Sequence, residues 1–313
     1  MRIGFGCVKL GSASHGRTER SDVRLIEEAI DRGVRTFDTA DVYGSGSSER
    51  ILGRGIRHHR AEVVIATKAG YVFRPRSRVE QSARKVGHRV RAMLPSGQGG
   101  SATASPGGGS YAQQDFSPQH LRRALDASLR RLGTDYVDVF QLHGPPRALP
   151  GLLAELHDLV DSGKVRRFGV GAESVTSATE WAAVDGVEIV QLPFGVLDPE
   201  AAGDVFPETA ARGIEVWARG VLGGGVLRAG APPDDPKRPL VDALERLARQ
   251  HGIDVYQLAV GFVRSYPEIT TVLIGISSEA HLRRNMELMA GPPLDAELLV
   301  DLLALLAPGG SRP

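Results

Sequence analysis

The sequence predicts an α/β fold, a (β/α)8 TIM barrel that forms a single domain over residues 1–313 with a long insertion after the third strand. The first observation is an alternation of short β-branched runs with amphipathic helical patterns, which is typical of βαβ units around a parallel sheet. The second is the count of eight units, which favours a closed barrel over an open doubly wound sheet. The third is that Lys68 and His143 end two of the runs and Asp38 ends a shorter one. Functional residues of such barrels lie at the carboxyl ends of the strands.

The first half of the chain supplies four units. Its predicted strands cover residues 3–10, 35–38, 63–68 and 137–142, and its predicted helices cover 22–32, a segment from 48, 117–133 and 151–162. The helix at 22–32 has apolar residues at helical spacing and is followed by Gly33, a common residue at helix ends. The helix that starts at Ser117-Pro118 has proline at the first helical position, where the missing N–H has no partner to lose.

The second half of the chain repeats the pattern. Its predicted strands cover residues 167–170, 187–192, 214–218 and 271–274, and its predicted helices cover 177–183, 200–212, 241–251, 255–265, 279–289 and 295–306. A glycine- and proline-rich loop at 220–239 separates the seventh strand from the two helices that follow it.

Residues 71–114 do not fit this scheme. Nearly fifty residues lie between Lys68 and Ser117, where two to six normally connect a strand to its helix. Residues 96–110 are rich in glycine and serine, which predicts a flexible segment. Residues 74–91 carry seven Lys or Arg against one acid, and apolar residues from Val79 to Met93 recur at helical spacing among them, which predicts a basic amphipathic helix. Either this is a solvated helix face, or it is a lid that docks a polar substrate or a partner.

Composition narrows the classes of function. With 42% hydrophobic and 24% charged residues, the chain has the balance of a globular protein with an ample core. A net charge of +1 gives no global reason to expect nucleic acid or a membrane as partner. Cys7 is the single cysteine, so neither an internal disulfide nor a cysteine metal site is expected, and no metal is predicted. Without a signal pattern or an apolar run of about 20 residues, a cytoplasmic location is expected.

Four polar residue types meet the needs of one reaction. Asp38, Tyr43, Lys68 and His143 fall at or near the ends of strand-like runs. Reduction of a carbonyl requires a proton from the protein while a cofactor supplies a hydride. These four residue types are the ones that such a reduction needs in order to hand over the proton.

These residues and their flanks resemble the aldo-keto reductase superfamily, in a bacterial branch. The run Asp38-Thr39-Ala40-Asp41-Val42-Tyr43-Gly44, followed by Glu49, is similar to its first signature. Lys68 and His143 follow in the family's order. The resemblance implies a barrel that binds NADPH without the Gly-x-Gly-x-x-Gly motif, which is absent before any predicted helix here.

The resemblance also implies roles. Tyr43 would be the general acid, and Lys68 would lower the pKa of its phenol from the ordinary value near 10. Asp38 would hold Lys68 charged, and His143 would orient the carbonyl. Gln191 would bind the nicotinamide carboxamide.

Other cofactor positions match the family less well. Gly171-Ala172 replaces the usual Ser-Asn pair after strand five. After strand seven, Arg219 stands where the family often has an aromatic ring that stacks on the nicotinamide, and a guanidinium can also stack. Gly220 and Leu222, which follow it, are further candidates for cofactor binding.

The last segment resembles the part that binds the pyrophosphate and adenosine. Its predicted cofactor-binding residues are Gly275, Ser277, Ser278, His281, Arg284 and Asn285. The glycine and the following helix suit a phosphate, and Asn285 would contact adenine. Because Ser277, Ser278, His281 and Arg283 or Arg284 can surround a 2′-phosphate, we expect NADPH, with NADH less favoured.

The leading hypothesis is NADPH-dependent reduction of an aldehyde or ketone, with a small-molecule carbonyl as the partner. A sugar or lactol dehydrogenase would use the same residues in reverse. A third hypothesis, from another class, is a weakly active cofactor-binding regulatory subunit. The sequence leaves the substrate and the oligomeric state open.

Overall fold

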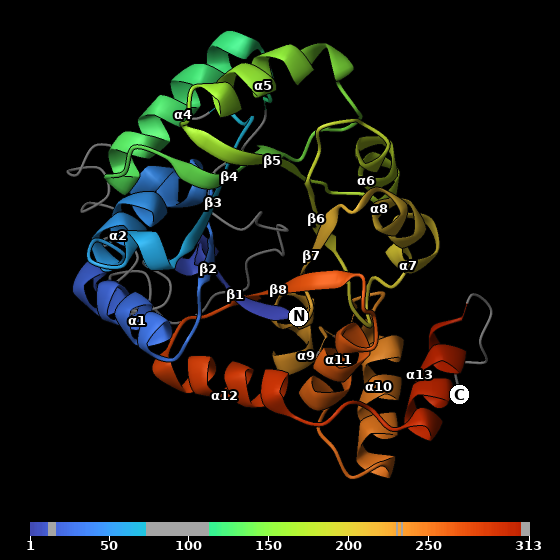
Figure 1. Cartoon of the computed structure of the whole chain (residues 1–313). Helices are drawn as coiled ribbons and strands as arrows, with labels where there is room; N and C mark the ends of the chain where they lie inside the picture. Colours follow the sequence, from blue (N-terminus) through green and yellow to red (C-terminus); the bar gives the residue numbers. More distant parts are fainter. Residues whose placement is uncertain (12–16, 73–112, 230, 233, 308–313) are drawn as a thin grey trace.

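The structure, a computed structural model, describes residues 1–11, 17–72, 113–229, 231–232 and 234–307. Eight parallel strands pair in chain order, and the eighth pairs with the first, so the sheet closes into a barrel. Helices form a ring around it (Figure 1). The predicted (β/α)8 barrel is confirmed.

The strands are β1 (Arg2–Gly6), β2 (Thr36–Asp38), β3 (Val64–Ala69), β4 (Val137–His143), β5 (Val165–Gly171), β6 (Ile189–Pro193), β7 (Glu215–Arg219) and β8 (Ile269–Gly275). The α-helices are α1 (Glu19–Asp31), α2 (Ser47–Gly55), α4 (Pro118–Leu132), α5 (Leu153–Asp161), α6 (Val175–Ala182), α7 (Ala201–Asp204), α8 (Phe206–Arg212), α9 (Val226–Ala229), α10 (Arg238–Gln250), α11 (Val255–Arg264), α12 (Glu279–Ala290) and α13 (Ala296–Leu306). Short 3-10 turns are η1 (Cys7–Lys9), η3 (Tyr43–Gly46), η4 (Arg60–Glu62), η5 (Pro150–Leu152) and η6 (Gly223–Gly225).

Local chemistry explains where the predicted bounds were wrong. Helix α1 begins at Glu19 rather than at Asp22, because Thr18 and Ser21 form a capping box, each side chain accepting the other's backbone N–H. The helix predicted at 200–212 is two helices, α7 and α8. Pro207 lies in the first turn of α8, the part of a helix in which proline is tolerated.

Two apolar cores hold the barrel. A large one fills the space between the strands and the helix ring, and a small one lies inside the barrel, made by Ala66, Val139, Ile189, Trp217 and Leu273. Above this inner layer the inward positions of the strands become polar or have no side chain. The change begins at Lys68 on β3, Gln141 on β4 and Gln191 on β6. The polar layer therefore lies directly on the packed apolar layer inside the barrel.

The chain leaves and rejoins the barrel mouth through a short antiparallel pair, here called the stem (residues 70–72 and 113–116). Val72 N–H donates to the carbonyl of Gln113 (3.0 Å), and Asp115 N–H donates to that of Gly70 (2.8 Å). Gly70 has a φ of 139°, and a Cβ on it would meet the Phe116 ring at 2.3 Å, so only glycine fits. The predicted helix at 74–91 and flexible segment at 96–110 lie outside the described residues. Within the described part of the chain, no helix has the length and apolarity needed to cross a bilayer.

Candidate active site

Lys68 and Asp38 form a buried ion pair at the barrel mouth. Lys68 Nζ donates to both carboxylate oxygens of Asp38 (2.7 and 2.6 Å) and to the carbonyl of Thr39 (2.9 Å). The two residues are 1% and 5% exposed. Burial alone would lower the pKa of Lys68, but Asp38 and Tyr43 together raise it above its ordinary value. The ammonium is therefore held charged by the adjacent carboxylate.

Tyr43 lies beside this ion pair, in turn η3 directly after the Asp38 strand. Lys68 Nζ is 5.2 Å from the centroid of its ring. The expected lowering of the Tyr43 pKa is wrong in its net direction. Burial raises the pKa above its ordinary value by more than the charges of Lys68 and Arg219 lower it. Tyr43 is therefore a protonated phenol at neutral pH, the form that can donate a proton.

His143 ends β4 next to Tyr43. The two rings meet edge to face with centroids 5.8 Å apart, and His143 is 9% exposed. Burial, followed by the charges of Lys68 and Arg219, holds the pKa of His143 well below its usual range. The imidazole is therefore neutral at neutral pH.

Two glutamines and a glycine lie beside the ion pair. Gln191 Nε2 donates to Asp38 Oδ1 (2.8 Å), so part of the amide predicted to bind a carboxamide is engaged with the catalytic candidate Asp38. Gln141 is buried, and neither its amide oxygen nor its nitrogen has a partner among the described residues. Both glutamine Oε1 atoms lie 3.4–3.5 Å from the position of a Cβ built on Gly171. Gln141 was not singled out from the sequence, because nothing in a strand-like run marks an amide as unsatisfied.

Arg219 ends β7 and turns across the mouth towards β5. Its Nη2 donates to the carbonyl of Ala172 (2.9 Å) and to Glu173 Oε2 (2.6 Å). Gly220 and Leu222 follow directly, and Gly220 accepts a hydrogen bond from Gly223 N–H (2.7 Å). Glu173 was missed in the sequence, since its partner is 46 residues away along the chain.

The β8 end gathers some of the predicted phosphate residues and not others. Ser277 Oγ and His281 Nδ1 are hydrogen-bonded (2.9 Å), and Ser278 caps α12. Arg284 instead pairs with Asp254 and, at 3.7 Å, with Glu287. Asn285 is buried.

Two cations that the sequence did not mark lie near this segment. Arg17 Nη1 donates to the carbonyl of Ser277 (3.2 Å), while its Nε pairs with the buried Asp22 (2.6 Å). Lys9 Cε is the nearest atom, at 3.9 Å, to a Cβ built on Gly275. Both residues come from the β1–α1 connection, so only the closure of the barrel brings them to β8.

A second buried ion pair lies behind the site. Glu49 on α2 is 0% exposed, accepts from Thr67 Oγ1 (2.7 Å) and pairs with Arg131 Nε of α4 (2.5 Å). Asp41, 1% exposed, has no hydrogen-bond partner for either carboxylate oxygen among the described residues. Burial and then the nearby charge of Glu49 raise the pKa of Asp41 well above its usual range.

Known proteins share both the sequence pattern and the fold. The model of the Aldo/keto reductase family matches residues 2–305. The chain is 28% identical over 307 residues to D-threo-aldose 1-dehydrogenase of a Pseudomonas species, which covers 92% of this chain and 89% of that protein. It is 25% identical over 311 residues to the NADH-specific methylglyoxal reductase of Escherichia coli K12, with 91% and 88% covered. The holo structure of an aldo-keto reductase from Bacillus halodurans has the same fold, with a TM-score of 0.77, 23% identity and 97% and 91% covered.

Proposed function

This chain belongs to the aldo/keto reductase family, and we propose that it reduces an aldehyde or ketone with NADPH, using Tyr43 as the general acid. The observation that carries the proposal is the buried Lys68–Asp38 ion pair beside a protonated phenol. A buried charge pair is costly to keep unless the geometry is well satisfied, and here it adjoins a phenol that can donate a proton to a carbonyl oxygen. The neutral His143 next to Tyr43 adds a second donor for the same oxygen.

The strand ends fit a nicotinamide dinucleotide at two places. Near Gly171, the Oε1 atoms of Gln141 and Gln191 face one space and match the two donors of a carboxamide NH2 group. At Gly275, a Cβ would have only Lys9 within 4 Å among the described residues, which leaves room for a phosphate near the N-terminus of α12. When bound, the reduced cofactor supplies the hydride.

The protein's own groups divide the remaining work. Tyr43 donates its hydroxyl proton to the carbonyl oxygen as negative charge develops there. Lys68 stabilises the resulting phenolate, and Asp38 keeps Lys68 charged and in place. His143 donates a neutral hydrogen bond to the same oxygen. Arg219 is proposed to contact the nicotinamide, since it lies close enough to affect the pKa of both Tyr43 and His143.

The proposal is tested by following NADPH oxidation with a panel of aldehydes and ketones, for the wild type and for Tyr43→Phe. General acid catalysis contributes roughly 100- to 10,000-fold, so Tyr43→Phe should lose at least about 100-fold in turnover. Cofactor affinity, read from fluorescence quenching, should stay within about twofold. A Tyr43→Phe enzyme that retains its turnover would defeat the assignment. A wild type that oxidises NADPH with none of the aldehydes and ketones in the panel would also defeat it.

A second candidate is oxidation of a sugar or lactol at the same site. The Glu173–Arg219 ion pair puts a carboxylate and a guanidinium at the mouth, next to the half-buried Tyr71. Such groups hydrogen-bond vicinal hydroxyls well. One relative is named as an aldose dehydrogenase. Reduction of NADP⁺ in the presence of a panel of aldoses, compared with simple alcohols, would favour this candidate if only the aldoses react.

The preference for NADPH is proposed from the groups around Ser277. Ser278, His281 and Arg17 supply hydroxyl, imidazole and guanidinium donors there, whereas Arg284 is held by Asp254 and Glu287. Dissociation constants for NADPH and NADH, measured side by side at pH 6, test this proposal. Equal values would overturn it.

A further inference from the structure

Among the described residues, none hydrogen-bonds the Nδ1 atom of His143, the contact by which catalytic histidines are usually oriented. Ring orientation and tautomer are commonly set by a hydrogen bond to the second ring nitrogen. The Nδ1 atom of His143 is buried and has no such partner among the described residues. Some other contact must therefore hold this ring in place.

The stem contacts the backbone of His143. Gln114 Nε2 donates to the carbonyls of His143 (3.1 Å) and Gly144 (2.7 Å), the last residue of β4 and the first beyond it. Both amide protons of one side chain thus hold two successive peptide groups. The Gly144 N–H in turn donates to the carbonyl of Gly171 on β5 (2.8 Å). The backbone that carries His143 is fixed from the stem on one side and from the sheet on the other.

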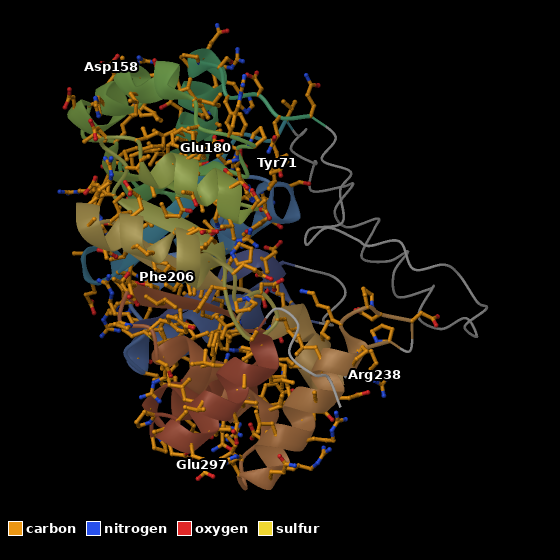
Figure 2. The ribbon with its side chains drawn as sticks, turned by 90° about the vertical axis from the view of Figure 1, so that its right-hand side faces the viewer. Tyr71, Asp158, Glu180, Phe206, Arg238 and Glu297 are labelled. Atoms are coloured by element: carbon orange, nitrogen blue, oxygen red, sulfur yellow. The ribbon has the colours of Figure 1, made fainter. Side chains whose placement is uncertain are left out.

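The stem also contacts the ring of His143. The Tyr71 ring meets the imidazole edge to face, with centroids 4.9 Å apart and an angle of 83° between the planes. This is closer than the Tyr43 ring, at 5.8 Å. A Cβ built on Gly144 would lie 2.9 Å from Tyr71 Oη, and Gly144 has a φ of 65°, so a side chain there would displace Tyr71. Figure 2 labels Tyr71 at the edge of the ribbon, where the stem begins.

We propose that Gln114 and Tyr71 are positioning residues for His143, and that the stem is a working part of the active site. Gln114 fixes the backbone of His143, and Tyr71 fixes the plane of its ring. The consequence for turnover rests on the proposed function, because a misplacement of about 1 Å can cost on the order of 100-fold in rate. The consequence for the conformation of His143 does not depend on it.

The test compares Gln114→Ala with Gln113→Ala, a matched control. Gln113 is the neighbouring glutamine, and its side chain is exposed. Four quantities are measured for each variant: kcat and KM with one accepted carbonyl, the dissociation constant for NADPH, and the ¹⁵N NMR signals of the histidine side chains. The chain has nine histidines, so the His143 signals are identified by their loss in His143→Asn.

In Gln114→Ala we expect kcat to fall by about 10- to 100-fold, with KM and the NADPH dissociation constant within about twofold. The His143 imidazole signals should shift or broaden, while Gln113→Ala should match the wild type in every quantity. Unchanged His143 signals and kcat in Gln114→Ala would overturn the proposal. A rise in KM at constant kcat would also overturn it, because Gln114 would then contact the substrate.

Tyr71→Ala removes the ring that packs against the imidazole, and it should lower kcat and perturb the His143 signals. A Tyr71→Ala enzyme with wild-type kcat and wild-type His143 signals would remove Tyr71 from the proposal. If Gln114→Ala fails to fold, Gln114→Met keeps the side-chain length without the N–H donors; failure of both, with Gln113→Ala folded, would mean a purely structural role. If the wild type reduces no carbonyl, the proposed function fails, and the NMR comparison still decides this inference.

Discussion

Two buried ion pairs lie near each other, one at the barrel mouth and one behind the site, and the surroundings of their cations differ. Lys68–Asp38 and Arg131–Glu49 both have a carboxylate that is at most 5% exposed, and both are hydrogen-bonded by more than one group. The cation of the first is an ammonium beside the Tyr43 ring, whereas that of the second is a guanidinium that joins α4 to α2. The first pair therefore lies against the proposed general acid, whereas the second joins two helices. Burial of a charge pair alone does not mark a catalytic site.

Removing the cation of the first pair should have the largest effect. Lys68→Met should lower turnover by roughly 100- to 10,000-fold, because the phenolate of Tyr43 loses its stabilising charge. It should also cost about 3–5 kcal/mol of stability, since Asp38 is left buried without its partner. Adding Asp38→Asn should restore much of the stability, measured by urea unfolding, and none of the turnover. A double variant that recovered activity would remove the distinction between the pairs.

Removing the cation of the second pair should affect stability alone. Arg131→Met should lower the free energy of unfolding by about 3–5 kcal/mol, because Glu49 is left buried and unpaired. With folded protein, kcat should stay within about twofold of the wild type. The adjacent exposed Arg130 provides the control, since Arg130→Met should change neither quantity. A large fall in kcat for Arg131→Met, in protein still folded at the assay temperature, would mean that the two pairs are coupled.

Asp41 feels the charges of both pairs and should show a smaller, pH-dependent effect. A carboxyl whose pKa is raised by folding stabilises the folded state fully below its unfolded pKa, near 3.9. That contribution is lost as the pH rises towards the folded pKa. Asp41→Asn removes this dependence, so the variant should gain stability relative to the wild type as the pH rises from 4 to 8. Urea unfolding of both proteins at pH 4 and pH 8 measures this effect. A difference in unfolding free energy between variant and wild type that is the same at both pH values would contradict the raised pKa.

The smallest expected effect is that of pH on kcat, which should stay constant between pH 6 and pH 8. Because the pKa of Tyr43 is raised and that of His143 is well below its usual range, neither group should titrate between pH 6 and pH 8. The kcat for carbonyl reduction should therefore be flat over that range at saturating substrate and NADPH. A limb near pH 6.5, the unperturbed pKa of histidine, would show that His143 is charged during turnover.

The barrel and the position of the four polar residues could be predicted because both follow from local periodicity. Strand runs that end at Lys68 and His143 place these residues at one face as soon as the strands are parallel. The direction of the Tyr43 pKa could not be predicted, because it depends on how deeply the ring is buried. Asp41 escaped notice for the same reason.

Residues missed in the sequence share a different cause. Gln114 is recognised only through its hydrogen bonds to a strand end 29 residues away, and Arg17 through a contact with Ser277, 260 residues away. No periodic pattern records such pairings. The break between α7 and α8 has a local cause instead, because Pro207 lies in the first turn of α8 and is visible in the sequence.

The stem has a consequence for how this enzyme can vary. Its two hydrogen bonds hold the chain ends on either side of residues 73–112 next to each other, whatever lies between them. Each doubling of a flexible loop's length adds only about 0.6 kcal/mol to its closure cost. The segment between the two strands of the stem can therefore be replaced by one of different length, in evolution or by design, while the barrel keeps its register.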